Sequence, residues 1–535
     1  MARAVYSEAA GIGRIVPAAV AVPEDAEDVV TLVKWAKASS LSLIPRGSGT
    51  SMGGGAIGPG VIVDLSRMNE IGAVDIVNHS IRVGPGALRG DVDRVARESA
   101  LRFPVDPSSG EYCTIGGMVS TNAAGAHTLR FGATRDWVIG LDCVFEDGSR
   151  AVVSRLEPVP KGIPALERFL AEAGPEIMSA RGDDSIAHPG VAKDSSGYGI
   201  AAYAATGKLI DLLVGSEGTL VIVVGATLGL APTARATSGI LGAFDSLDAA
   251  VNAAVKARAA GAVACELLDR TFLEVAATGG GAHIPVAALS AIPEGTEAAL
   301  LAEVEGASQA EVEKNANALA AAFEQSGATF TRVALGPNDQ HEIWELRHAA
   351  SPILSKLDPA LKSMQFVEDG AVPPDCLADY VRGVRDALEK RGVRGVIFGH
   401  AGDAHMHLNP LIDVSKATWR ADVDGLLDDI VNLTARLGGT LAGEHGDGRL
   451  RTPLLSRVWS AHAVALFAKV KAAFDPTGIL NPGVKVPLVG QKPIGDVKYD
   501  PSLAPLPDKA RDALEKVASE RMYSTFRLSM IPENG

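Results

Sequence analysis

Cysteine is scarce in this 535-residue sequence. Its four cysteines, Cys113, Cys143, Cys265 and Cys376, are far apart and form no C-x-x-C pair. Zinc ribbons, iron–sulfur sites and disulfide frameworks all need paired or clustered cysteines. We therefore expect reduced thiols and a cytoplasmic protein.

An excess of positive charge is also missing. The 64 acidic residues outnumber the 50 basic ones, so the formal net charge is −14, and the acidic residues are spread along the chain. Binding to a polyanion would need a basic face instead. We expect no nucleic-acid partner.

Long hydrophobic runs are absent as well. The longest uncharged apolar stretch, residues 218–234, contains Pro232 and three glycines, and it is shorter than the roughly 20 residues of a membrane-spanning helix. We interpret it as buried strands. The N-terminus lacks the basic-then-apolar pattern of a secretory signal. Peripheral attachment to the inner membrane remains compatible with the sequence.

The common nucleotide-binding loops are missing, although a glycine-dense segment is present. No G-x-x-x-x-G-K-[ST] motif occurs. Residues 45–55, P-R-G-S-G-T-S-M-G-G-G, lie between the apolar runs 41–44 and 61–65, where a Rossmann loop would open a helix. Glycines leave backbone N–H groups accessible to a diphosphate. The pattern predicts a strand, a phosphate loop and a strand, with an ordinary glycine turn as the alternative.

Four segments resemble, in order, the vanillyl-alcohol-oxidase type of FAD-binding domain (PCMH type). The first is P-R-G-S-G-T-S with the following V-I-V-D-L-S-R-M-N-E-I, and the others lie within residues 103–132, 193–200 and 211–222. Met118 and Ala124 depart from the family, in which Asn and Gly are common. The resemblance implies FAD contacts from these segments and from a returning L-N-P-G segment, namely from Arg46, Gly47, Ser48, Gly49, Thr50, Ser51, Pro107, Gly116, Gly117, Thr121, Asn122, Gly125, Glu217, Gly218, Ile222 and Asn481.

The same resemblance bears on how FAD is held. Sugar-oxidising members commonly carry a histidine close behind the pyrophosphate loop. Ser48, Thr50, Ser51 and Met52 provide no such nucleophile. We expect FAD to be bound non-covalently.

Length and pattern predict several domains of the α+β class. A chain of 535 residues exceeds one ordinary core, and its strands and helices mix without strict βαβ alternation. We expect an FAD-binding domain of two subdomains in residues 1–232 and a cap with an antiparallel sheet, holding substrate and metal, in 233–450. Residues 451–490 would return to the FAD domain as helix. Residues 491–535 would form a proline-rich connector and an amphipathic tail.

Histidines gather in one segment. Residues 399–410 read G-H-A-G-D-A-H-M-H-L-N-P, and a hairpin that pairs His400 with His405 would place both on one face with His407. Residues 443–448, G-E-H-G-D-G, add a carboxylate and an imidazole. Such groups form a divalent metal shell, of the zinc or manganese type. Scattered surface histidines are the alternative.

These two motifs resemble the FAD-linked D-2-hydroxyacid dehydrogenases, which include D-lactate, glycolate and D-2-hydroxyglutarate dehydrogenases. The resemblance implies that His400, His407 and Glu444 are metal ligands, that the two histidines also hold substrate, and that His445 is the base. Arg347 matches the family's arginine for the substrate carboxylate, with a solvated helix face as the alternative.

His405 departs from the family, in which Asn is usual at this position. It could be a fourth ligand, a donor behind the ligands, or a change in substrate preference. The sequence leaves these three roles open.

The implied reaction is oxidation of a D-2-hydroxy acid to the 2-oxo acid with hydride transfer to N5 of FAD. We expect D-lactate ahead of glycolate and D-2-hydroxyglutarate. An electron-transfer subunit of a larger flavoprotein complex is the alternative. A quinone, a cytochrome or an electron-transfer protein could accept the electrons, and a homodimer is compatible with the sequence.

A final amphipathic pattern lies in the tail. Residues 508–522 place Ala510, Ala513, Leu514 and Val517 on one helical face. Alternating apolar residues follow in 523–530. We expect this helix to pack on its own domain, with a partner or membrane contact as the alternative.

Overall fold

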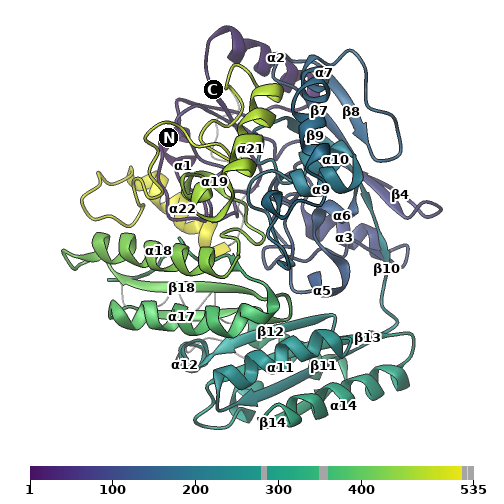
Figure 1. The fold of residues 1–535 in the computed structure, drawn as a ribbon, viewed down its shortest axis with the longest axis vertical. Helices are drawn as coiled ribbons and strands as arrows, with labels where there is room; N and C mark the ends of the chain where they lie inside the picture. The colour runs from purple at the N-terminus through teal and green to yellow at the C-terminus, as the bar shows by residue number, and fades with distance from the viewer. Residues whose placement is uncertain (279–285, 349–359, 521–526, 528–535) are drawn as a thin grey trace.

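The computed structural model describes residues 1–278, 286–348, 360–520 and 527 (Figure 1). In Figure 1 the N-terminal part of the chain and helix α21 fill the upper region, and the teal and green middle of the chain fills the lower one. Helices and antiparallel sheets are mixed throughout. The expected α+β class is confirmed. The apolar stretch in 523–530 falls outside the described residues.

A small parallel sheet carries the glycine-dense loop. Its strand order is β1 (Ala19–Ala21), β3 (Val61–Asp64), β2 (Leu43–Arg46). Leu43 pairs with Val61 and Arg46 with Asp64, so the loop leaves the carboxyl end of β2. Helix α2 (Ala26–Ala38) connects β1 to β2 and begins at Asp25, whose carboxylate accepts two backbone N–H groups. The predicted strand, loop and strand are confirmed.

An antiparallel five-stranded sheet forms the second half of the upper region. Its order is β4 (Ile71–Asp75), β5 (Ser80–Val83), β9 (Ile222–Gly229), β7 (Val138–Val144), β8 (Arg150–Ser154), and β6 (Leu101–Arg102) pairs separately with β10 (Ala231–Pro232). The remaining helices of this region are α1 (Ala2–Val5), α3 (Arg89–Arg97), α4 (Ile115–Thr121), α5 (Thr128–Phe131), α6 (Thr134–Trp137), α7 (Pro164–Ala171), α8 (Ala173–Ser179), α9 (Ile200–Thr206) and α10 (Leu209–Leu213).

The lower region is one antiparallel sheet of eight strands. The order is β14 (Ala328–Ala334), β11 (Ala236–Phe244), β13 (Ala298–Gly306), β12 (Ala264–Asp269), β17 (Arg394–His400), β18 (His405–Asp413), β15 (Leu361–Ser363), and β16 (Gly370–Ala371) also pairs with β18. Its helices are α11 (Leu247–Ala259), α12 (Arg270–Thr278), α13 (Val286–Ala291), α14 (Gln309–Gln325), α15 (Pro337–His348), α17 (Leu377–Lys390) and α18 (Trp419–Arg436).

Both faces of the large sheet are buried, which follows from continuous apolar strands rather than alternating ones. Leu267 packs with α11, α14, α17 and α18, whereas the next residue, Leu268, packs with α12 and α15. Likewise, Leu300 belongs to the core of Leu267, and Leu301 belongs to the core of Leu268. Successive strand side chains point to opposite faces, so helices cover each side.

The C-terminal part returns to the upper region. Short helices α19 (Gly448–Arg451) and α20 (Leu455–Val458) lead to α21 (Ala461–Phe474), whose Leu466 and Phe467 pack in one core with Leu166 and Phe169 of α7. Helix α22 (Asp508–Glu520) buries Ala510 and Ala513 in a cluster that includes Val5 and Tyr6 at the N-terminus.

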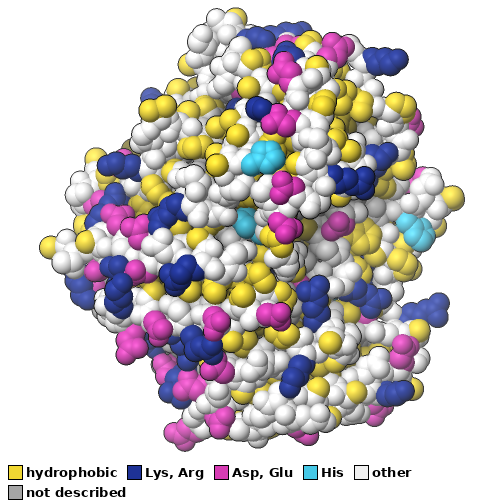
Figure 2. Space-filling model, viewed as in Figure 1, with side chains coloured by type: hydrophobic (Ala, Val, Ile, Leu, Met, Phe, Trp, Pro, Cys, Tyr) yellow, Lys and Arg dark blue, Asp and Glu magenta, His cyan; other side chains and the backbone are white. Residues whose placement is uncertain are grey.

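The surface shows no basic face in the view of Figure 2. Lysine and arginine side chains alternate there with acidic ones, in line with the net charge. Among the described residues, no helix combines the length and apolarity needed to cross a bilayer.

Candidate active site

A cavity of about 1530 Å³ runs from the glycine-dense loop to the histidine-rich strands. It is lined on the upper side by residues of the loop, of α4 and of the segment before β9, and on the lower side by His407, Asn409 and Arg347. Its length and the mixture of polar and apolar walls suit an elongated ligand.

The glycine-dense loop is built to present N–H groups. The carbonyl oxygens of Gly47 and Ser48 accept hydrogen bonds from Arg527 (2.8 and 2.9 Å), and that of Gly49 accepts one from the Ala10 N–H (3.0 Å). Within the described chain, no backbone N–H of residues 48–52 donates a hydrogen bond. Gly49 has φ +75°, which glycine adopts without strain. Exposed N–H groups of this kind fit the phosphates of FAD.

Most of the residues expected to contact FAD line this cavity, namely Arg46, Gly47, Ser48, Gly49, Thr50, Ser51, Pro107, Gly116, Gly117, Thr121, Glu217 and Gly218. The structure places the other four elsewhere. The side chain of Ile222 packs in an apolar core with Val144, and Gly125 does not line the cavity.

Asn122 and Asn481 instead hold backbone in place. The Asn122 side-chain oxygen accepts from the Arg135 N–H at 2.9 Å. The Asn481 amide donates to Gly55 O (3.0 Å) and Glu217 O (2.8 Å). Asn481 thus ties the C-terminal return to the loop and to the segment before β9.

Two expected cofactor residues have side chains with structural partners. The Arg46 guanidinium, 3% exposed, donates to the backbone oxygens of Tyr6, Glu8 and Ala56. Glu217 accepts from the N–H groups of Asp447 and Gly448 and pairs with Lys485. Burial raises the pKa of Glu217, against the opposing effect of Lys485.

The histidine hairpin forms as the sequence predicts. Strands β17 and β18 pair His400 with His405, and residue 404 turns the chain in the left-handed region (φ +54°). One ligand-type atom from each of His400, His405, His407 and Glu444 lies within 4.8 Å of the others, and all four side chains are buried. The alternative of scattered surface histidines is wrong. This cluster could hold a divalent metal.

Each cluster member has a partner outside the cluster. His400 Nδ1 faces Glu266 Oε1 at 2.5 Å, and His407 Nδ1 donates to Glu368 O at 2.8 Å. The remaining ring atom, Nε2, lies 3.2 Å from Glu444 in His400 and 3.5 Å from it in His407. Partners of this kind fix tautomer and ring orientation in metal sites.

Charge is balanced within this buried region. Burial acts to raise the pKa of Glu444, but Lys193, 3.1 Å away, and His400 hold it well below its ordinary value. Burial lowers the pKa of His407. Glu444 is therefore a carboxylate and His407 a neutral imidazole, which are the forms that bind metal ions.

His445 lies at the cavity, with a side chain that is 25% exposed. Its Nδ1 is 3.0 Å from Glu368 Oε1, and its ring stacks on that of His407 with centroids 5.5 Å apart. Burial acts to lower its pKa, but Asp369 and Glu368 raise it to about 9. A bound cation would oppose that rise.

Arg347 is not on a solvated helix face. It is 9% exposed, and its Nε donates to Glu266 Oε2 at 2.6 Å. Its guanidinium lies over the Phe398 ring. Burial acts to raise the pKa of Glu266, but His400 and Arg347 hold it well below its ordinary value. One carboxylate thus connects the expected substrate arginine to an expected metal ligand.

Several residues around the cluster were missed in the sequence analysis. Glu266, Glu368, Asp369 and the ammonium of Lys193 all contact it. Glu266 offered a signal, since a single acid in the apolar strand A-C-E-L-L must find a buried partner. The other three offered none, because their neighbours come from distant segments.

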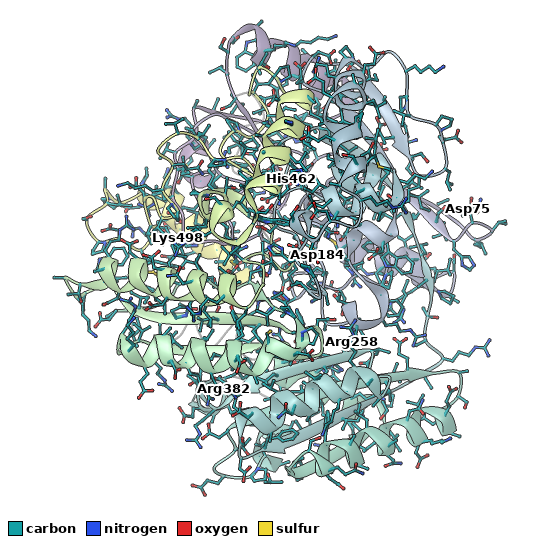
Figure 3. The ribbon with its side chains drawn as sticks, viewed as in Figure 1. Asp75, Asp184, Arg258, Arg382, His462 and Lys498 are labelled. Atoms are coloured by element: carbon teal, nitrogen blue, oxygen red, sulfur yellow. The ribbon has the colours of Figure 1, made fainter. Side chains whose placement is uncertain are left out.

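His462 belongs to a different part of the molecule. Figure 3 labels it on α21, and its Nδ1 lies 3.1 Å from Ser185 Oγ. Lys498, also labelled, belongs to the connector before α22 and lines the cavity.

Comparisons with known proteins agree with this geometry. Residues 17–154 match the model of an FAD binding domain, and residues 233–484 match that of the FAD linked oxidases, C-terminal domain. The glycolate oxidase subunit GlcD of Bacillus subtilis is 29% identical over 90% of this chain and 92% of its own length. The D-lactate dehydrogenase of Archaeoglobus fulgidus is 29% identical over 86% and 89%.

The D-2-hydroxyglutarate dehydrogenase of Escherichia coli is also 29% identical, over 90% of this chain, although the chain spans about half (49%) of that protein. Among solved structures, 4-ethylphenol oxidase from Gulosibacter chungangensis superposes with a TM-score of 0.65 at 16% identity, covering 91% of this chain and 92% of that one. An alkyldihydroxyacetonephosphate synthase gives 0.59 at 14% identity, over 86% and 76%. These two likenesses show the fold.

Proposed function

Because this chain belongs to the family of FAD-linked D-2-hydroxyacid dehydrogenases, we propose that it oxidises a small D-2-hydroxy acid, D-lactate first, to the 2-oxo acid. The observation that carries this proposal is the cavity that joins the glycine-dense loop to His407, Glu444 and His445. FAD accepts a hydride from carbon when bound.

The substrate end of the cavity is formed by the lower region. Arg347, held by Glu266, supplies a fixed cation for the substrate carboxylate. Asn409, buried beside His407, adds an amide to the same wall. These groups would hold the acid by its carboxylate at the lower wall of the cavity.

We assign His445 as the base for the substrate hydroxyl. The Glu368 carboxylate faces its Nδ1 at 3.0 Å, so Nε2 is the atom left to take the proton. Asp369 accepts the His445 backbone N–H at 2.9 Å and fixes this segment. Ser51 donates to the His445 carbonyl at 2.7 Å, so the glycine-dense loop positions the base.

His400, His407 and Glu444 would hold a divalent metal, zinc or manganese-like, and the donor set fits such an ion. Two imidazoles and a carboxylate are a common catalytic shell. A metal there polarises a bound hydroxyl and lowers its pKa.

FAD is proposed to bind non-covalently. Among the lining residues, Cys113 is a nucleophile by type, but burial raises the pKa of its thiol to about 11. A neutral thiol is a poor nucleophile. A quinone, a cytochrome or an electron-transfer protein would reoxidise the flavin. We also propose that the domains end at residues 232, 450 and 490, as expected from the sequence.

A dicarboxylate such as D-2-hydroxyglutarate is the second candidate. Lys362 of β15 lines the cavity, as Arg347 does, and both belong to the lower region. A second substrate carboxylate would pair with Lys362, whereas lactate would leave it without a partner from the substrate.

The test is anaerobic bleaching of the flavin by a panel of acids. The panel holds both enantiomers of lactate, both enantiomers of 2-hydroxyglutarate, and glycolate. Bleaching by D-acids is expected, and bleaching by L-acids alone would refute the proposal. Lys362→Met should reduce kcat/KM for D-2-hydroxyglutarate far more than for D-lactate if the dicarboxylate is the substrate. Absence of bleaching by every acid would favour an electron-transfer subunit.

A further inference from the structure

His405 packs against both of the other histidines of the cluster. Its ring centroid is 5.3 Å from that of His400 and 4.7 Å from that of His407. The side chain is fully buried, and it does not line the cavity.

The partners of His405 follow the pattern of the other two rings. In His400 and His407, one nitrogen faces an acceptor outside the cluster and the other faces Glu444. In His405, Nε2 lies 2.8 Å from Asp369 Oδ1. Each of the three imidazoles is therefore held from behind in the manner of a metal-binding histidine.

Asp369 determines which nitrogen of His405 carries the hydrogen. This carboxylate accepts from the N–H groups of Glu444 and His445 and from Arg451 Nη1 (3.1 Å). A carboxylate that receives these three N–H groups acts as an acceptor, so His405 Nε2 donates to it and Nδ1 carries a lone pair.

That lone pair has no partner. His405 Nδ1 is completely buried and makes no hydrogen bond within the described residues. A buried acceptor without a partner destabilises the folded protein, and it is rare unless a ligand satisfies it.

We propose that His405 Nδ1 is a fourth ligand of the divalent metal held by His400, His407 and Glu444. This inference rests on the metal site of the proposed function. It assigns a ligand at a position where the family commonly has Asn.

The chain makes room for this ring at Gly443. A Cβ on Gly443 would lie 2.6 Å from His405 Cδ2 and Nε2, which is too close for any side chain. The glycine directly before Glu444 thus lets His405 and Glu444 approach each other.

A fourth protein ligand would limit how the metal ion can bind substrate. His407 and Glu444 line the cavity, whereas His405 lies behind them. Four protein ligands would close a tetrahedral ion, so substrate can bind only if the ion accepts five or six ligands. A nitrogen-rich shell of this kind favours iron, cobalt, nickel or zinc over magnesium or calcium.

The experiment compares His405→Asn with His400→Asn and with His462→Asn, a control outside the cluster. The affinity of each chelator-treated FAD-loaded protein for Co²⁺ and Zn²⁺ is measured against a competing chelator. His405→Asn should weaken binding at least about tenfold and change the visible spectrum of bound Co²⁺, while His462→Asn leaves both unchanged. Unchanged affinity and spectrum in His405→Asn would overturn the inference.

A measurement on the unaltered protein covers the case in which a variant does not fold. Pulsed electron paramagnetic resonance of the Cu²⁺-loaded protein counts coordinated imidazoles through their remote nitrogens. Three are expected, and two would overturn the inference. If His400→Asn also leaves metal binding unchanged, the metal of the proposed function fails; if only His405→Asn does so, that function stands without a fourth ligand.

Discussion

The ammonium of Lys193 lies 3.1 Å from Glu444 Oε2, and neither side chain is more than 6% exposed. Lys193 also donates to Gly125 O at 2.8 Å. One lysine therefore joins a segment of the FAD-binding half to a proposed metal ligand. The pair neutralises a carboxylate that would otherwise be isolated in a buried cluster.

Lys193→Met should destabilise the metal-free protein by about 3–5 kcal/mol, because breaking a buried ion pair leaves one charge uncompensated. The loss should be smaller in the metal-loaded protein, where the cation compensates Glu444. Thermal unfolding with and without Zn²⁺ measures both values. The exposed Lys492→Met is the control, and an equal loss in both states would contradict the prediction.

Substitutions of the metal ligands and of the base should have different effects on metal content and kinetics. His400→Asn or His407→Asn removes a ligand, so metal content falls and both kcat and KM change. His445→Asn should leave metal and FAD in place and lower kcat by roughly 10²- to 10⁴-fold. Elemental analysis and steady-state kinetics distinguish the two. Full activity after exhaustive chelation, without detectable metal, would show that the cluster is structural.

Activity should rise with pH. A base must be neutral to accept a proton, and Asp369 and Glu368 raise the pKa of His445 to about 9 against the effect of burial. In Glu368→Gln one of these carboxylates is lost, so the rise of kcat/KM should move to lower pH. Profiles of the two proteins test this shift, with Glu294→Gln as an exposed control. An unmoved profile would exclude His445 as the titrating base.

Stability should depend on pH through Asp269, which is 2% exposed and accepts the Phe272 N–H at 2.8 Å. Burial raises its pKa to about 7. Because the folded pKa lies above the unfolded one, this contribution to stability is complete below pH ~4 and is lost as the pH rises through about 7. Asp269→Asn should flatten this decline in urea unfolding between these limits. An unchanged slope, equal to that of Asp245→Asn, would contradict it.

The C-terminal segment should affect FAD retention. Arg527 is 1% exposed, donates to Gly47 O and Ser48 O, and pairs with Asp64 (3.2 Å). Arg527→Ala, or truncation after Pro507, should therefore loosen the glycine-dense loop and lower both FAD affinity and the melting temperature. FAD release followed by fluorescence measures this, with Lys509→Ala as the exposed control on α22. Unchanged FAD affinity in both variants would refute the role.

Much of the site could be predicted because its signals are local. The hairpin that pairs His400 with His405 needs only two apolar runs and a short turn, and the structure has this register. The glycine-dense loop between β2 and β3 could likewise be predicted from its local sequence. In contrast, the partners of these groups lie far away in the sequence, so no local pattern predicts them. Glu266 and His400 are 134 positions apart, and Lys193 and Glu444 are 251 apart.

The sequence by itself determined the α+β class and the residue types of the cluster, since apolar periodicity and histidine spacing act over a few residues. The FAD-binding fold followed from the resemblance of four sequence segments to a known family. Only the tertiary structure decided that Arg347 is buried against Glu266, that the Asn481 side chain binds backbone, and that His405 Nδ1 has no partner. The physical reason is that burial, hydrogen-bond partners and pKa depend on which distant segments meet. Arg347 and Glu266, for example, are 81 positions apart in the chain and meet only in the folded protein.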